Sequence, residues 1–189
     1  MGLWETLTGR SKPVGPNLDA LFSLPSAAIT LQTAAAFTPT GSGSVCYRAA
    51  EGAAFAQTQK DVVTLLDNDD DPDVEQSTDS YGYTWLLARQ KPDDLPALVT
   101  DLHTVNTSLE EQGFGPSLLC SLVSFTDVAG RSMALVYLYK QGTFYPFAPQ
   151  PGQRRDNLLE IQVRDLVKDD LPVEPQLNRW MPLWGAPGL

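Results

Sequence analysis

Three strand-like segments separated by short turns constrain the fold of this chain more than any other feature. They cover residues 118–125, 133–140 and 143–147. Strands with such short connections run antiparallel, because a parallel pair needs a crossover of a dozen or more residues. The first segment is apolar almost throughout, which predicts a central strand buried on both faces. Pro146 predicts an edge position for the last one, since proline donates no hydrogen bond to a neighbouring strand.

Apolar residues at helical spacing predict three amphipathic helices. They cover residues 53–67, a segment that starts at Asp93 or Asp94 and stops at Gly113, and residues 157–169. The second helix has Pro96 in its first turn, where a missing N–H is tolerated. Its apolar stripe is the most regular in the chain and consists of Leu95, Leu98, Leu102, Val105 and Leu109.

Two other segments carry residues typical of helix starts. Residues 17–36 predict two helical pieces, the second of which begins at Pro25 and Ser26. At the other end of the chain, Asn157 with Glu160 three residues later resembles a capping box, in which two side chains bond the free N–H groups of a helix start.

Two strands are predicted in the first half of the chain. Residues 38–43 are rich in Gly, Thr and Ser and predict a turn, and residues 44–49 predict a short strand after it. Residues 81–88 predict a second strand. Side chains alternate along a strand, so one face of it would carry Tyr81, Tyr83, Trp85 and Leu87.

Together these elements predict an α+β fold. Its mixed, largely antiparallel sheet has about five strands, with helices mainly on one face. A C-terminal β-meander is followed by a helix and an irregular tail rich in Trp and Pro. We divide the chain into an N-terminal apolar turn and linker at 1–16, a single α+β domain at 17–170, and the tail at 171–189.

The charge of the chain disfavours several classes of partner. The formal net charge is -10 and the sequence pI is near 4.4. Nucleic acids and anionic lipids require a basic patch, whereas the only adjacent basic pair here is Arg154 and Arg155. Because this patch is missing, we expect no nucleic-acid binding. We also expect no direct insertion into a membrane, because no run of 18 apolar residues is present.

Reactive side chains are few. Cys46 and Cys120 lie in apolar, strand-like runs and are expected to be free, buried thiols, with a disulfide left open. Two cysteines and one histidine lack the ligand spacing of a zinc site. His103, the only histidine, lies beside the apolar stripe of a predicted helix. The chain also has no phosphate-binding motif. From these observations together we predict no catalytic residue, no cofactor and no metal, and a protein that is not an enzyme.

Aromatic residues supply the candidates for partner binding, because Tyr and Trp anchor many protein interfaces. One group consists of Asp79, Tyr81 and Tyr83, which either belong to a core-facing strand or display an aromatic face. The other consists of Trp180 and Trp184 in the tail. The tail either folds back onto its own domain or inserts into another protein.

Several stretches resemble the PspAB family of proteins associated with phage shock protein A. They are GRSKP at 9–13, LDALF at 18–22, STDSYGY at 77–83, DL at 94–95 with DLH at 101–103, and GFG at 113–115 with LLC at 118–120. The resemblance implies a cytoplasmic accessory protein of a PspA-like envelope-stress system, peripheral to the inner membrane through its partner. That partner would be a PspA-like coiled-coil protein or another protein, and a homodimer is a further option.

The family has no catalytic residues to carry over to this chain. Two other functions stay open at this point. One is a chaperone-like module that holds an extended client segment on a sheet edge. The other is an enzyme of unrecognised chemistry.

Overall fold

The computed structural model describes residues 16–67 and 72–189. The apolar turn and most of the linker predicted at 1–16 lie outside the described residues. The α-helices are α1 (Leu24–Ala35), α2 (Ala53–Leu66), α3 (Leu95–Leu109) and α4 (Asn157–Val167). Short helical turns are 3-10 helices at Leu18–Ser23, Gly115–Ser117 and Leu177–Arg179 and a π-helical turn at Glu110–Phe114. The strands are β1 (Thr38–Tyr47), β2 (Glu75–Thr78), β3 (Thr84–Arg89), β4 (Leu118–Thr126), β5 (Ser132–Leu138), β6 (Thr143–Phe147), β7 (Pro149–Gln150) and β8 (Arg154–Arg155).

A six-stranded sheet in the order β2-β3-β1-β4-β5-β6 forms the centre of the molecule. Every neighbouring pair in it is antiparallel. The predicted α+β fold with a largely antiparallel sheet is therefore confirmed, and so is the central position of β4. The sheet has one strand more than about five, because β2 was not anticipated.

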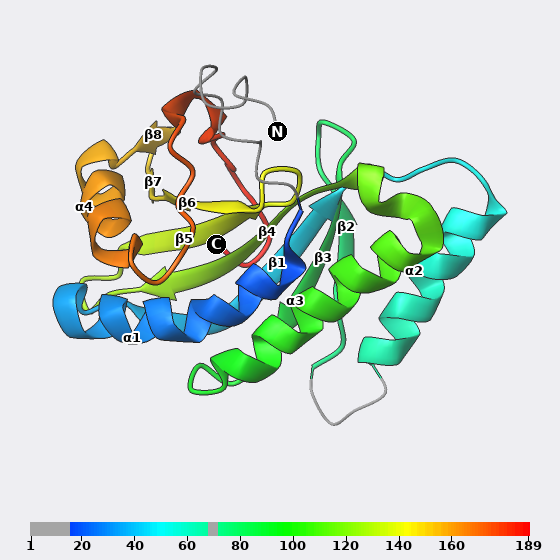
Figure 1. Ribbon diagram of the computed structural model, residues 1–189, viewed down its shortest axis with the longest axis horizontal. Coiled ribbons are helices and arrows are strands. Elements are labelled where there is room, and N and C mark those ends of the chain that lie inside the picture. Colours follow the sequence, from blue (N-terminus) through cyan, green and yellow to red (C-terminus); the bar gives the residue numbers. More distant parts are fainter. Residues whose placement is uncertain (1–15, 68–71) are drawn as a thin grey trace, which may run out of the picture.

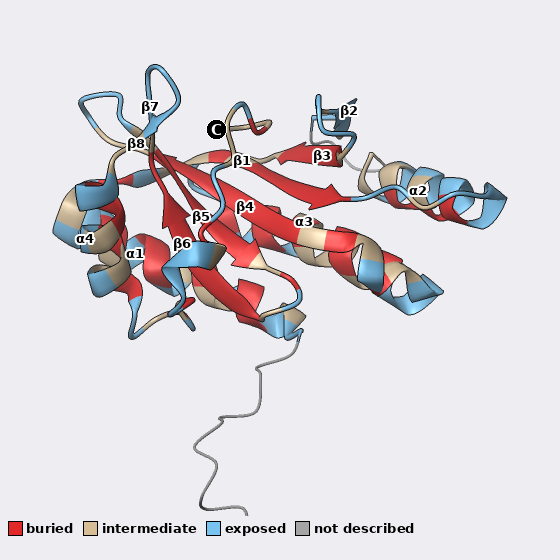
Figure 2. Ribbon diagram, turned by 90° about the horizontal axis from the view of Figure 1, so that it is seen from above, coloured by how far each residue is buried: buried red, intermediate tan, exposed pale blue. Residues whose placement is uncertain are grey.

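The two faces of the sheet are covered differently (Figure 1). The four α-helices lie on one face, where Leu31 of α1, Leu98 of α3 and Val163 of α4 join a core that includes Val45 and Phe125 of the sheet. The other face is covered by the C-terminal tail. Figure 2 shows the central strands buried along most of their length, whereas β2 and much of α2 are exposed at one end of the sheet.

Strand β1 is longer than predicted, because the segment 38–43 is extended rather than a turn. The register against β4 shifts between Pro39 and Gly43, which marks a bulge. Gly41 adopts a φ of 84° at this point, and a Cβ there would lie 2.2 Å from the carbonyl oxygen of Gln90. The glycines that suggested a turn instead allow a strand to bend close to its neighbour.

Helix starts agree with the sequence in two cases and differ in one. Pro25 lies in the first turn of α1, and the Asp94 carboxylate caps α3 by accepting a 3.2 Å hydrogen bond from the N–H of Ala97. The predicted capping box of Asn157 and Glu160 at the start of α4 does not form. Asp156 caps this helix instead, because the buried Glu160 accepts hydrogen bonds from the N–H of Ala148 and from Arg155.

The two edges of the sheet differ in what lies against them. Strand β6, the edge strand that Pro146 predicted, is bordered by the start of the tail. The N–H of Phe144 donates to the carbonyl of Pro172 at 2.8 Å, and the N–H of Glu174 donates to the carbonyl of Phe144 at 2.7 Å. Strand β2 forms the opposite edge, and within the described chain only β3 pairs with it.

Candidate protein-binding site

The turn between β2 and β3 is organised by one carboxylate. Oδ1 of Asp79 accepts hydrogen bonds from the N–H groups of Tyr81 at 2.9 Å and Tyr83 at 3.0 Å. Oδ2 accepts a 3.0 Å bond from the indole of Trp85. Burial by itself would raise the pKa of the Asp79 carboxyl, but the bonds from Trp85, Tyr83 and Tyr81 outweigh it and hold that pKa below its usual value. The turn is therefore preorganised around a charged Asp79.

This turn displays Tyr81 to solvent. The side chain of Tyr81 is 80% exposed, whereas Trp85 is only 4% exposed and belongs to the core. Tyr83 is partly buried, and the Arg48 guanidinium lies 5.6 Å from the centre of its ring. The prediction that Tyr81 shares a strand face with Trp85 is wrong, because Gly82 takes a φ of 83° and β3 begins only at Thr84.

Strand β2 adds an exposed edge beside this turn. All four of its residues are exposed, and Glu75 forms an ion pair with Arg89 of β3. Sequence reasoning missed this strand because it contains no apolar residue. The available signal was the Asp79–Gly82 turn, since a strand after a tight turn commonly pairs with the segment before it.

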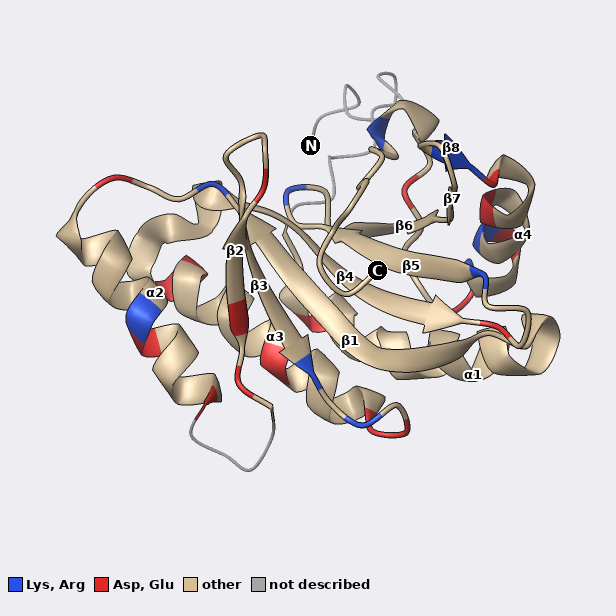
Figure 3. Ribbon diagram, turned by 180° about the vertical axis from the view of Figure 1, so that it is seen from behind, with Lys and Arg blue, Asp and Glu red and all other residues tan. Residues whose placement is uncertain are grey.

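Acidic residues are concentrated in the part of the chain that forms this end of the sheet. The described residues between 51 and 111, which span α2, β2, β3 and α3, include 11 Asp and Glu but only 3 Lys and Arg. Residues 131–179, by contrast, contain 6 acidic and 7 basic residues. Figure 3 shows acidic positions on α2, β2 and α3, and basic positions around β8 and α4. The molecule is therefore strongly polarised in charge.

The two tail tryptophans do not belong to this surface. Trp180 is 6% exposed, stacks on Tyr145 with ring centroids 6.0 Å apart, and donates its indole N–H to the carbonyl of Glu174 at 3.0 Å. Trp184 is partly buried and lies 5.0 Å from the ring of Phe147. The tail therefore folds back onto its own sheet, which is the first of the two predicted alternatives.

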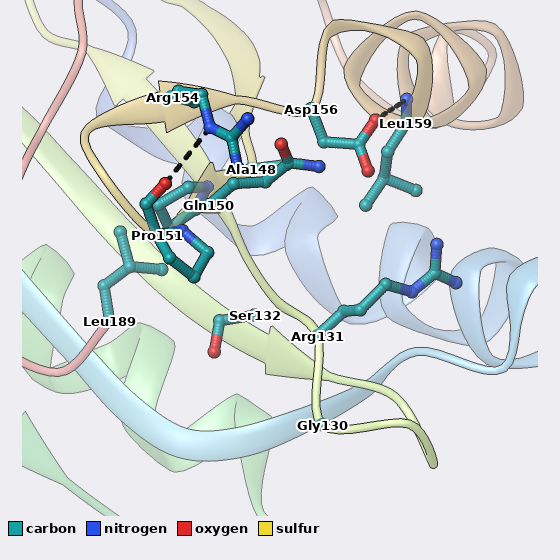
Figure 4. A pocket seen from close by; sticks show the side chains of 11 residues that line it. Gly130, Arg131, Ser132, Ala148, Gln150, Pro151, Arg154, Asp156, Leu159 and Leu189 are labelled. Atoms are coloured by element: carbon teal, nitrogen blue, oxygen red, sulfur yellow. Dashed lines mark hydrogen bonds between the residues drawn. The ribbon is translucent and has the colours of Figure 1, made fainter.

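A cavity of about 550 Å³ lies between the β4–β5 turn, the β7–β8 hairpin and the start of α4 (Figure 4). Its charged groups contact the chain itself. Arg131 pairs with Asp127 at 2.7 Å, and Nε of Arg154 donates to the carbonyl of Pro151 at 3.2 Å. The carboxylate of Asp156 caps α4. Each of these contacts therefore stabilises one turn, hairpin or helix start in the cavity wall.

The nucleophilic and titratable side chains singled out in the sequence have structural contacts. Cys46 and Cys120 are free and buried, as predicted, and lie directly opposite each other on β1 and β4. The hydrogen bond between the two thiols, together with burial, raises the pKa of Cys46 far above that of a reactive thiol. His103 contacts Phe22 and lies 3.4 Å from Asp19.

The described residues contain no group of three or more His, Cys, Asp or Glu side chains that could hold a metal ion. In the same part of the chain, no helix has the length and hydropathy to cross a bilayer.

The fold and the site define an α+β protein with an open, acidic sheet edge and an aromatic turn at its end. The chain belongs to the PspAB family, because the family model described as PspA associated protein B matches residues 1–188. This membership gives it a phage-shock-related accessory role and associates it with PspA, a protein partner. Neither curated proteins nor solved structures give a match to the chain.

Proposed function

We propose that this chain is a non-catalytic adaptor of a PspA-like envelope-stress system that binds a coiled-coil PspA-like protein through the β2–β3 turn. The observation that carries the proposal is the display of Tyr81, 80% exposed on a turn held by the carboxylate of Asp79. A large aromatic side chain on a rigid turn makes a good anchor, because little conformational freedom is lost on binding. The adaptor would work in the cytoplasm and reach the inner membrane only through its partner.

A non-catalytic role agrees with the state of the side chains that could do chemistry. The Cys46 thiol is held neutral by burial and by Cys120. The Asp79 carboxylate has a lowered pKa and accepts three hydrogen bonds, so it is a poor general base. The contacts of these two groups are structural, which supports a role in binding.

The test is a binding comparison between truncations of two exposed side chains. Tyr81→Ala removes the proposed anchor, and Leu158→Ala removes a side chain that is 70% exposed on α4, at the other end of the sheet. An anchor residue contributes about 2 kcal/mol or more, so Tyr81→Ala should weaken binding about 30-fold. The affinity for the PspA-like protein of the same host is measured by calorimetry with both purified proteins.

Leu158→Ala should bind like the parent chain, and both variants should keep the parent melting temperature, since exposed truncations change stability little. If Tyr81→Ala binds the PspA-like protein as tightly as the parent, the proposed site is wrong.

The chaperone-like alternative is favoured by one observation, the exposed strand β2 at the open edge of the sheet. Such a module would bind unfolded segments of several unrelated proteins, whereas an adaptor binds one folded partner. Competition between the folded PspA-like protein and a urea-unfolded, reduced client for the same chain separates the two functions.

A further inference from the structure

We infer that the outer edge of β2 receives an extended, basic segment of the partner, which joins the sheet as an additional antiparallel or parallel strand. This inference rests on the proposed function, because it places the partner at the same end of the sheet as Tyr81. It goes further in naming the binding mode and the chemistry of the segment.

The backbone of β2 offers unused hydrogen-bonding groups along this edge. The N–H of Asp79, the residue after β2, donates to the carbonyl of Tyr83 at 2.9 Å, so the backbone of Asp79 faces the neighbouring strand. Residues that face the neighbouring strand in this way alternate along an antiparallel ladder. Ser77 therefore bonds to β3, whereas Gln76 and Thr78 direct their N–H and C=O groups away from it. The two outward residues are exposed.

The opposite edge of the same sheet already has a segment bound in this way. Extended residues 172–174 lie along β6, and Phe144 both donates to Pro172 and accepts from Glu174. The chain thus closes one edge with its own tail. Since an open edge is a template for strand addition, β2 is the edge that a partner segment can join.

Charge selects the kind of segment. The outward edge lies in the part of the chain whose described residues include 11 acidic and 3 basic ones. Asp73, beside β2, is exposed, and the exposed Glu75 of β2 pairs with Arg89. A second copy of the chain would bring two such acidic regions together, which is unfavourable. A strand with Lys or Arg on alternate residues would instead place positive charges along this edge, with the association accelerated at low salt.

The test uses a defined probe, an eight-residue peptide of alternating Lys and Thr with a fluorescent label, titrated with the full chain. Gln76→Pro removes an outward N–H that makes no bond to β3, a position where an edge strand tolerates proline. Gln76→Ala is the matched control, because it also loses the side-chain contact with Gln59 but keeps the N–H.

We expect Gln76→Ala to bind the peptide within about twofold of the parent and Gln76→Pro to bind at least about tenfold more weakly. The same peptide with Glu in place of Lys should not bind. Hydrogen exchange provides a readout that needs no variant: the amides of Gln76 and Thr78 should exchange rapidly in the free chain and become protected with the Lys peptide.

Equal binding of the peptide to Gln76→Pro and Gln76→Ala, with no protection of these amides, would mean simple adsorption to an acidic surface and would overturn the inference. Binding of the PspA-like protein to the variants then distinguishes a failure of this inference from a failure of the proposed function. If binding of the PspA-like protein is lost with Tyr81→Ala but retained with Gln76→Pro, the proposed site is supported and strand addition is not. If neither change affects it, the proposed site itself is wrong.

Discussion

Truncation of Trp180 measures how firmly the tail belongs to the fold. The side chain is 6% exposed, stacks on Tyr145 and bonds to the carbonyl of Glu174, which is itself buried. Replacing a buried aromatic side chain with Ala costs about 3–5 kcal/mol, because it removes apolar contact and leaves a cavity. Losing the indole N–H also leaves the Glu174 carbonyl without this donor. We therefore expect Trp180→Ala to lower the free energy of unfolding by about 4 kcal/mol.

Trp184→Ala is the matched control within the same tail. Its ring contacts Phe147 but is partly exposed, so its truncation should cost about 1–2 kcal/mol. With a urea slope of about 2 kcal/mol per M, the unfolding midpoint should fall by about 2 M for Trp180→Ala and by about 0.5–1 M for Trp184→Ala. Far-UV circular dichroism follows the transition, since each change removes a fluorophore.

The reasoning would be refuted if Trp180→Ala left the midpoint within about 0.3 M of the parent. The tail would then be only loosely attached to the sheet. A loss of partner binding in such a stable variant would return Trp180 to the partner-binding candidates.

Two more predictions concern the groups with shifted pKa values. Asp79 has a lowered pKa when folded, so its stabilising effect is present at neutral pH and is lost as the pH falls through the folded pKa. Asp79→Asn should accordingly lower the urea midpoint at pH 7 and make little difference at the lowest pH at which the chain stays folded; an equal loss at both would point to packing rather than charge. Cys46 has a raised pKa and is buried against Cys120, so both thiols should react with Ellman's reagent only as fast as the chain unfolds. Rapid reaction of the native chain at pH 8 would contradict the buried, neutral state.

Elements with strong local patterns were predictable from the sequence. Helix α3 has its predicted cap at Asp94, its full apolar stripe is buried, and Gly113 leaves the helical conformation with a φ of 84°. The meander of β4, β5 and β6 follows from its short turns. Pro146 correctly marked an edge strand, because the missing N–H is a property of the residue itself.

Elements without a local pattern were not predictable. Strand β2 consists of four polar residues and becomes a strand only because β3 lies beside it. The segment that precedes Ser44 contains residues typical of turns, and its pairing with β4 makes it extended. Both cases depend on a partner strand, which contributes the hydrogen bonds that the residues cannot supply by themselves.

The sequence by itself determined the α+β class, the order of the main helices and strands and the acidic charge, because each of these depends on residue type and short-range spacing. Only the tertiary structure decided that Trp180 is buried and Tyr81 is exposed, although both are aromatic residues among turn-forming neighbours. Their difference arises from distant contacts. Trp180 meets Tyr145 on the face of the sheet opposite the main helix layer, whereas Tyr81 lies in a turn that Asp79 holds at the sheet edge.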